Sequence, residues 1–253
     1  MESAAHSHDP ALADSRVQSA FYGWSLSLYP TAGEAGGCWV QGKRKATAAG
    51  GVGDPERSRE EAARRAKTQV RRYCTANRLN RLGTLTYAGA RNHDPKLLRQ
   101  HLGRFFRSLR SAVGGEAFAY VWVPEWHKTD HGLHAHFAVG KFIARRHIVE
   151  AWGHGYVHIK LLGDLPVGSG KLAEARRAGR YLSKYAGKDF DHEHMPGLHR
   201  YEVAQGFQPE KVTVRALRLE DAIAHDRAAV LSLLSRIRQQ GYALREPGIR
   251  PVS

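Results

Sequence analysis

The sequence predicts an α+β fold in which an antiparallel sheet carries helices on one face and an active site on the other. Two observations lead to this prediction. Between Leu82 and Leu162, apolar β-rich runs and segments of helical periodicity follow in the order strand, helix, strand, strand, helix, strand. One of the strands contains two histidines, His134 and His136, within an apolar run. The order is that of the split βαβ arrangement of ferredoxin-like and RRM-like domains, in which one sheet face is left free for a ligand.

Local signals predict each element of this core. Asp94-Pro95 begins a helix whose apolar residues recur at helical spacing, and Gly114-Gly115 ends it. A polar loop from Trp126 to His131 joins two strands into an antiparallel hairpin. The predicted strands are 81–87, 118–125, 132–140 and 155–162, and the further predicted helices are 144–152 and 171–188.

The chain as a whole divides into four predicted parts. Residues 1–20 are small and polar and are expected to be disordered. Residues 21–79 form a hairpin and a basic helix from Pro55 to Asn77, a possible DNA-binding extension, and residues 80–190 form the core. Residues 191–253 contain a loop and an amphipathic helix, Leu217 to Arg238, which is expected to pack on the core or to mediate homo-oligomer assembly.

The charge of the chain points to a polyanionic partner. There are 39 Lys and Arg against 24 Asp and Glu, a formal net charge of +15 and a pI near 10.1. Nucleic acid is the first candidate for such a partner, and an anionic membrane is the weaker alternative. Part of the basic helix could lie along phosphates, although a solvated helix with Glu60 and Glu61 as ion-pair partners is nearly as consistent. The candidate DNA-binding residues of this helix are Arg64, Arg65, Arg71 and Arg72.

Membrane and disulfide roles find no support in the sequence. No apolar run approaches the length of a membrane span, and the N-terminus lacks a signal pattern. The two cysteines, Cys38 and Cys74, have no metal-binding or redox spacing and are interpreted as reduced thiols. We therefore expect a cytoplasmic protein that does not contact membranes.

The two histidines are candidate metal ligands. Alternate side chains of a strand share a face, so His134 and His136 would project side by side. If the hairpin turns near residues 128–130, Glu125 lies across from His134 and supplies a carboxylate. Two imidazoles and a carboxylate with open positions suit catalytic Mg²⁺ or Mn²⁺. A solvated polar strand face is the alternative, and the loop residues His127 and His131 are further candidate ligands.

The predicted helix 171–188 carries reactive side chains on one arc. At 100° per residue, Tyr181 and Tyr185 share their arc with three cations, Arg177, Lys184 and Lys188, while small and apolar residues occupy the opposite arc. Arg177 and the adjacent Arg180 are candidate DNA contacts. A phenolate can attack a phosphate to form a phosphotyrosine, and neighbouring lysines are expected to favour the phenolate and to neutralise transition-state charge. Core packing of the tyrosines is the alternative.

Taken together, these motifs resemble a known family. His134-Ala135-His136, followed by Arg180-Tyr181-Leu182-Ser183-Lys184-Tyr185-Ala186-Gly187-Lys188-Asp189, resembles the histidine-hydrophobic-histidine endonucleases. The closer resemblance is to rolling-circle replication initiators of small bacterial plasmids and phages, and Thr84-Leu85-Thr86-Tyr87 resembles their first motif. The resemblance covers roughly residues 80 to 190.

The resemblance implies a specific activity. Such enzymes nick one strand of an origin through a divalent metal and a tyrosine, leaving a covalent 5′-phosphotyrosine and a free 3′ hydroxyl, and they later reverse this step to close the circle. Here His134 and His136 would hold the metal with Glu125 as third ligand, and Lys184 and Lys188 would complete the two Tyr-x-x-Lys patterns. Tyr185 is the favoured nucleophile, with Tyr181 as a second nucleophile or its helper.

Two alternative functions remain open. A transposase or relaxase would use the same core. A non-catalytic split βαβ module would use its histidines and tyrosines to stack on single-stranded nucleic acid. The stretch Gly163–Lys171 lacks a complete P-loop, so a replication initiator of this kind would depend on a host helicase and a DNA polymerase.

Overall fold

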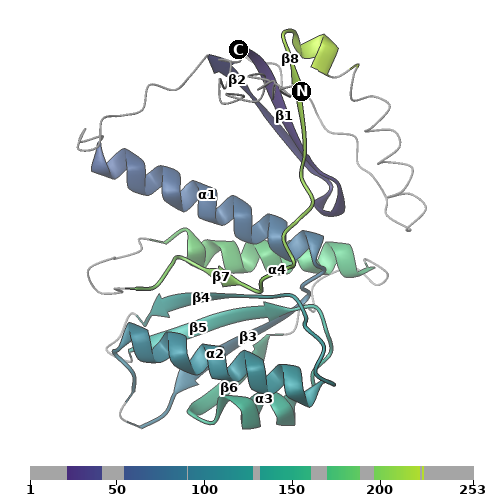
Figure 1. The fold of residues 1–253 in the computed structure, drawn as a ribbon. Coiled ribbons are helices and arrows are strands. Elements are labelled where there is room, and N and C mark those ends of the chain that lie inside the picture. Colours follow the sequence, from purple (N-terminus) through teal and green to yellow (C-terminus); the bar gives the residue numbers. More distant parts are fainter. Residues whose placement is uncertain are drawn as a thin grey trace, which may run out of the picture.

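The computed structural model describes residues 22–41, 54–89, 91–127, 132–160, 170–188, 197–222 and residue 224 (Figure 1). In chain order its elements are β1 (Tyr22–Tyr29), the 3₁₀ turn η1 (Pro30–Ala32), β2 (Glu34–Gln41), α1 (Pro55–Ala76), β3 (Arg81–Tyr87), α2 (Pro95–Ala112), β4 (Tyr120–Trp126), β5 (Leu133–Val139), α3 (Arg145–Trp152), β6 (Gly155–Lys160), α4 (Gly170–Ala186), β7 (Glu202–Val203) and β8 (Val212–Ala216).

The main sheet has the strand order β6-β3-β5-β4-β7, and each neighbouring pair is antiparallel. Its chain order, β3-α2-β4-β5-α3-β6, is the predicted split βαβ order. The α+β fold class is therefore confirmed. The short strand β7 adds to the edge beside β4, so β6 and β7 are the outer strands.

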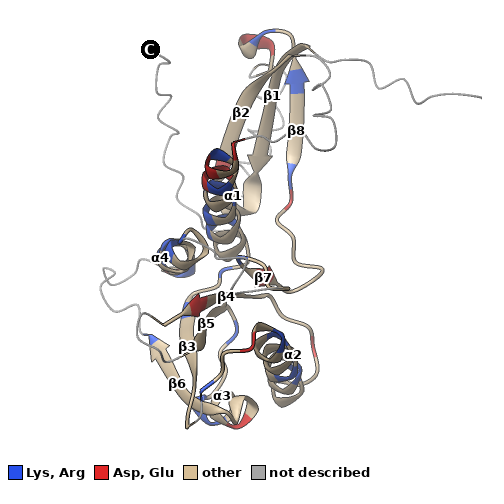
Figure 2. Ribbon diagram, turned by 90° about the vertical axis from the view of Figure 1, so that its left-hand side faces the viewer, with Lys and Arg blue, Asp and Glu red and all other residues tan. Residues whose placement is uncertain are grey.

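Helices cover both faces of this sheet, not one face as predicted. On one face, α2 and α3 bury an apolar core that includes Phe105, Phe137 and Trp152. On the other face, α1 and α4 form a second core with the sheet, in which Val70 and Leu182 are completely buried (Figures 1 and 2). The apolar arcs of α1 and α4 have to be removed from water, and the sheet supplies the surface. Only the β6 side of this face stays open, where Tyr156, His158 and Lys160 are exposed.

The two helices α1 and α4 approach closely where they cross. A Cβ atom on Gly179 would lie 3.1 Å from the Cα atom of Arg71 and 3.1 Å from the Cβ atom of Cys74. Glycine at this position of α4 therefore permits a backbone approach that a larger residue would obstruct. The close crossing fixes how α4, with its tyrosines, lies over the sheet.

A second sheet stands apart from the main one, in the order β2-β1-β8 (Figure 1). Strands β1 and β2 form the predicted N-terminal hairpin, and β2 begins earlier than expected, at Glu34. The third strand, β8, comes from the far end of the chain. Glu34 anchors this sheet to α1 through ion pairs with Arg71, at 3.0 Å, and Arg72, at 3.2 Å.

Capping residues start the long helices where the sequence predicts. Asp54 accepts hydrogen bonds from the backbone N–H groups of Glu56 and Arg57 at the start of α1, and Asp94 accepts one from Lys96 at the start of α2. Both caps are followed by proline at the first helical position. The predicted disordered segment 1–20 and most of the predicted helix 217–238 lie outside the described residues.

None of the helices in the described part of the chain has the length and apolarity needed to cross a bilayer.

Candidate active site

Strand β5 presents two histidines on the sheet face that packs against α4. Its pairing with β3 sets His136 opposite Thr84 and His134 opposite Thr86. On the other side of β5, Glu125 of β4 is the partner of His134. Because directly paired residues of antiparallel strands point to the same face, these five polar side chains lie on one face of the sheet.

The threonines hold one nitrogen atom of each histidine ring. Thr84 Oγ1 lies 3.0 Å from His136 Nδ1, and Thr86 Oγ1 lies 3.3 Å from His134 Nδ1. A hydrogen bond at Nδ1 fixes the ring orientation and directs the other ring nitrogen, Nε2, toward a ligand. The first predicted motif, Thr84 to Tyr87, thus supports the histidines from the neighbouring strand.

Glu125 connects the histidines to the end of α4. One of its carboxylate oxygens lies 2.6 Å from His136 Nε2, and the other forms an ion pair with Lys188. Burial alone would raise the pKa of the Glu125 carboxyl. The hydrogen bonds and positive charges of His136 and Lys188 outweigh burial and lower this pKa below its usual value.

The two tyrosines of α4 lie directly above this group. The Tyr185 ring stacks on the His136 ring with their centroids 3.8 Å apart and an interplanar angle of 21°. The hydroxyl oxygens of Tyr181 and Tyr185 are 2.8 Å apart, within hydrogen-bond distance. Both side chains are half-buried against the core beneath α4. Sites that the sequence placed on a strand and on a helix therefore meet in one place.

The surroundings of Tyr185 keep its hydroxyl protonated. Burial, the hydrogen bond with Tyr181 and the negative charge of Glu125 together raise the pKa of the Tyr185 phenol. The expectation that neighbouring lysines favour the phenolate is therefore wrong for the protein by itself. Lys188 does lie over the Tyr185 ring, at 4.7 Å from its centroid, but its ammonium is paired with Glu125, and Lys184 is exposed to solvent.

Lys160 is a component of this region that the sequence analysis missed. Its ammonium nitrogen lies 4.6 Å from the centroid of the Tyr181 ring. Strand alternation puts Lys160 on the same face as Tyr156 and His158, and the pairing of β6 with β3 puts this face beside the histidines. The alternation was available from the sequence, but the place of β6 next to β3 was not used to locate its side chains.

The donor set is chemically suited to a hard or borderline divalent metal. Two imidazoles and a carboxylate on adjacent strands are ligands of the kind that Mg²⁺ or Mn²⁺ accepts. Within the described residues, however, no three His, Cys, Asp or Glu side chains already converge as a metal cluster. Glu125 is engaged by His136 and Lys188 instead. Metal binding would require this carboxylate to exchange Lys188 for the ion.

The predicted DNA-binding arginines divide into two groups. Arg64, Arg65 and Arg180 are exposed, and Arg65 pairs with Glu61 on the same helix. Arg177 is half-buried. Arg71 and Arg72 are instead taken up by Glu34, and the Arg72 guanidinium also lies over the Tyr29 ring at 3.5 Å. These last two residues attach the second sheet to α1.

One family model matches the part of the chain that builds this site. Residues 80–190 match the replication-associated protein family of the ORF2 type. The match begins at the end of the α1–β3 connection and includes each of the strands and the helix that carry the site. It covers less than half of the chain. The match supports a role in the initiation of DNA replication.

Searches of curated proteins and of solved structures found no match to the chain.

Proposed function

We propose that the protein initiates rolling-circle replication as a metal-dependent, site-specific endonuclease and ligase for single-stranded DNA. One observation carries the proposal: the Tyr185 ring stacks on His136, so the candidate nucleophile lies directly beside the candidate metal ligands. The match of residues 80–190 to a replication-associated family supports the same activity and favours it over the transposase and relaxase alternatives.

The chemistry follows from the side chains that meet at this point. In the nicking step the Tyr185 hydroxyl oxygen would form a bond to phosphorus, and the bond from phosphorus to the 3′ oxygen of the preceding nucleotide would break. The phenol loses a proton and the departing 3′ oxygen gains one. Tyr181, whose hydroxyl lies 2.8 Å from that of Tyr185, is positioned to pass this proton on or to attack in a second round.

Three residues would hold the divalent ion: His134, His136 and Glu125. When bound, the metal polarises the non-bridging phosphate oxygens and aligns the phosphate for in-line attack. Thr84 and Thr86 would keep the imidazoles in place during this step. Once Glu125 turns to the ion, the Lys188 ammonium becomes available to the phosphate, where it would offset negative charge in the transition state.

The decisive experiment is a covalent-adduct assay on the full chain. The protein is incubated with labelled single-stranded DNA from its own replicon, with Mn²⁺ or with EDTA, and the products are separated on a denaturing gel. We expect a labelled protein adduct with Mn²⁺ and none with EDTA. Peptide mapping is expected to locate the adduct on Tyr185, or on Tyr181 if that residue attacks first.

Conservative variants assign the role of each tyrosine. Tyr185→Phe keeps the ring that stacks on His136 but removes the attacking oxygen, so it should abolish the adduct without reducing DNA binding. Tyr181→Phe should leave an adduct at Tyr185 at a reduced rate. DNA binding without an adduct on a verified origin strand would overturn the nuclease assignment in favour of a non-catalytic nucleic-acid-binding module.

A further inference from the structure

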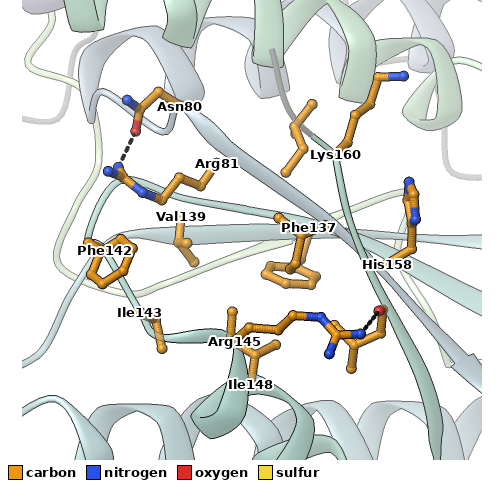
Figure 3. A pocket seen from close by; sticks show the side chains of 13 residues that line it. Asn80, Arg81, Phe137, Val139, Phe142, Ile143, Arg145, Ile148, His158 and Lys160 are labelled. Atoms are coloured by element: carbon orange, nitrogen blue, oxygen red, sulfur yellow. Dashed lines mark hydrogen bonds between the residues drawn. The ribbon is translucent and has the colours of Figure 1, made fainter. Parts of the chain in front are cut away.

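A cavity of about 630 Å³ lies at one end of the main sheet, between strands β3, β5 and β6 and the start of α3 (Figure 3). It belongs to the opposite side of the sheet from the histidines, and none of the candidate metal ligands or tyrosines lines it. Its size falls within the roughly 300–1,000 Å³ of ordinary ligand pockets. The cavity therefore needs an occupant that the candidate active site does not explain.

The interior of the cavity is apolar and aromatic. Phe137 lies at its centre, with Val139, Ile143 and Ile148 around it (Figure 3). The Phe137 ring fills the space above Gly83, where a Cβ atom would lie only 2.4 Å from the ring. At the rim, Phe142 is 72% exposed, an unusual state for a phenylalanine that has an apolar core beside it. An exposed aromatic ring over an apolar cavity is suited to stack on a flat, hydrophobic ligand.

Three cations surround this apolar interior. Arg81 lies with its guanidinium 5.7 Å from the Phe142 ring centroid, Arg145 reaches the Val157 carbonyl oxygen at 3.5 Å, and Lys160 lines the β6 side. Among the described residues, none of the three forms an ion pair with a carboxylate. The rim thus has a net positive charge, which complements a ligand that combines a flat ring with an anion.

Lys160 links this cavity to the candidate active site. Its side chain lines the cavity, and its ammonium extends toward α4, to 4.6 Å from the Tyr181 ring centroid (Figure 3). Strand β6, which carries Lys160, is an outer strand of the sheet. A single strand of DNA that passes the tyrosines can therefore turn around this edge, with Lys160 in contact with its backbone on the way.

We propose that this cavity binds one unpaired base of the same DNA strand whose phosphate is attacked at the tyrosines. The base would stack on Phe142 and enter above Phe137, while Arg81, Arg145 and Lys160 contact the adjoining phosphates. The inference rests on the proposed nuclease function and deepens it, because a base held at a fixed distance from the attacked phosphate selects the position of the nick.

Binding measurements in EDTA test this cavity without covalent chemistry. Fluorescence anisotropy is recorded with the full chain and labelled oligo(dT), oligo(dC) and oligo(dA) of about 15 nucleotides, a length within the usual site size of single-strand-binding surfaces. An abasic oligonucleotide of the same length keeps the phosphates and removes the bases. Phe142→Ala should weaken binding of at least one homopolymer by about 5- to 150-fold and leave binding of the abasic strand unchanged.

Matched variants separate the cavity from general effects. Leu217→Ala removes a side chain of the same 72% exposure elsewhere on the surface and should have no effect. Arg145→Ala should reduce affinity and the salt dependence of binding more than Arg146→Ala, since both arginines are exposed at the start of α3 but only Arg145 lines the cavity. Phe142→Ala with equal losses on homopolymers and abasic DNA, or with no loss on any homopolymer, would overturn the proposal.

Photo-cross-linking of the unmodified protein gives an independent test. Oligo(dT) with one 4-thiothymidine should cross-link, at some position of the modified base, to the tryptic peptide Phe142–Arg145. Cross-links confined to the opposite sheet face, for example to Tyr156, would overturn the proposal. Base-dependent binding that Phe142→Ala abolishes, without any Mn²⁺-dependent adduct, would support the cavity and overturn the nuclease; an adduct with binding insensitive to Phe142→Ala would overturn the cavity alone.

Discussion

Two threonine side chains of β3 determine how the histidines of β5 are presented. Thr84 and Thr86 hold the Nδ1 atoms of His136 and His134, which leaves the Nε2 atoms to face the metal position. We therefore predict that Thr84→Val, which keeps the shape and β-propensity of the residue, weakens Mn²⁺ binding by about 10- to 100-fold. Isothermal titration calorimetry on the full chain measures this change.

A second threonine provides the control for Thr84→Val. Thr213 lies at an exposed position of β8, outside the main sheet, so Thr213→Val makes the same chemical change on a strand without touching a histidine. It should leave Mn²⁺ binding unchanged. Equal Mn²⁺ affinities for the Thr84→Val protein and the unmodified protein would show that the hydroxyl does not orient His136.

Lys188 competes with the metal for Glu125. Its ammonium pairs with the carboxylate that is the candidate third ligand, so removing it should release Glu125 to the ion. We predict that Lys188→Met tightens Mn²⁺ binding by up to about fivefold, the value of a partly exposed ion pair, while it slows adduct formation. Lys184→Met, at an exposed position of the same helix, should leave Mn²⁺ affinity unchanged. A Lys188→Met protein that binds Mn²⁺ more weakly would contradict this role.

The sequence brings most of the candidate site within reach because its signals are local. Alternation along one strand puts His134 and His136 on one face, and helical spacing puts Tyr181 and Tyr185 on one arc. Lys160 could not be found in this way, since it reaches Tyr181 only through the pairing of β6 with β3. Likewise, the ion pairs of Arg71 and Arg72 with Glu34 depend on how the N-terminal sheet docks on α1.

At the scale of elements, the crossing of α1 and α4 positions the tyrosine helix. A Cβ atom on Gly179 would meet backbone atoms of Arg71 and the Cβ atom of Cys74 at 3.1 Å, none of which can turn aside like a flexible side chain. We predict that Gly179→Ala lowers the free energy of unfolding by about 1–3 kcal/mol, despite the better helix propensity of alanine. Urea denaturation followed by circular dichroism measures the loss.

Another helical glycine serves as the reference. Gly103 lies inside α2, and a Cβ atom there would meet only the end of the Arg107 side chain, at 3.4 Å. Gly103→Ala should therefore raise the free energy of unfolding by up to about 1 kcal/mol. If Gly179→Ala stabilised the protein to the same extent, the close crossing would not constrain α4.

Element boundaries were predictable where the signal is a cap. The Asp-Pro pairs at 54–55 and 94–95 start α1 and α2 as predicted because a side-chain acceptor and a fixed proline φ act within one turn of the chain. The covered sheet face was not predicted, since it depends on α1 packing against α4 and the sheet. Strand β8 was foreseen only as a short strand, and its pairing with β1 joins residues from opposite ends of the chain.

At the scale of the whole molecule, the charge of +15 should dominate affinity for DNA. The exposed Arg64 and Arg65 are candidates for phosphate contacts from α1 (Figure 2). We predict that replacing both by alanine weakens single-stranded DNA binding to a similar extent for every sequence, and lowers the slope of log K against log salt by about 1.4. Anisotropy titrations over a range of NaCl concentrations measure both quantities.

Arg71→Ala gives the contrasting result in this comparison. This residue pairs with Glu34, so its loss should lower the melting temperature and leave the salt slope nearly unchanged. An unchanged slope for the Arg64 and Arg65 double variant would instead mean that α1 does not contact phosphates.

The pairing of β1 with β8 also has a consequence for synthesis of the chain. The hairpin of β1 and β2 emerges from the ribosome first, but its third strand follows only after the segment that builds the main sheet. At about 5–20 residues per second, the hairpin waits roughly 10–40 seconds for β8. During that interval the outer edge of β1 is open to other strands, so the second sheet is the part of the molecule most dependent on chaperones during translation.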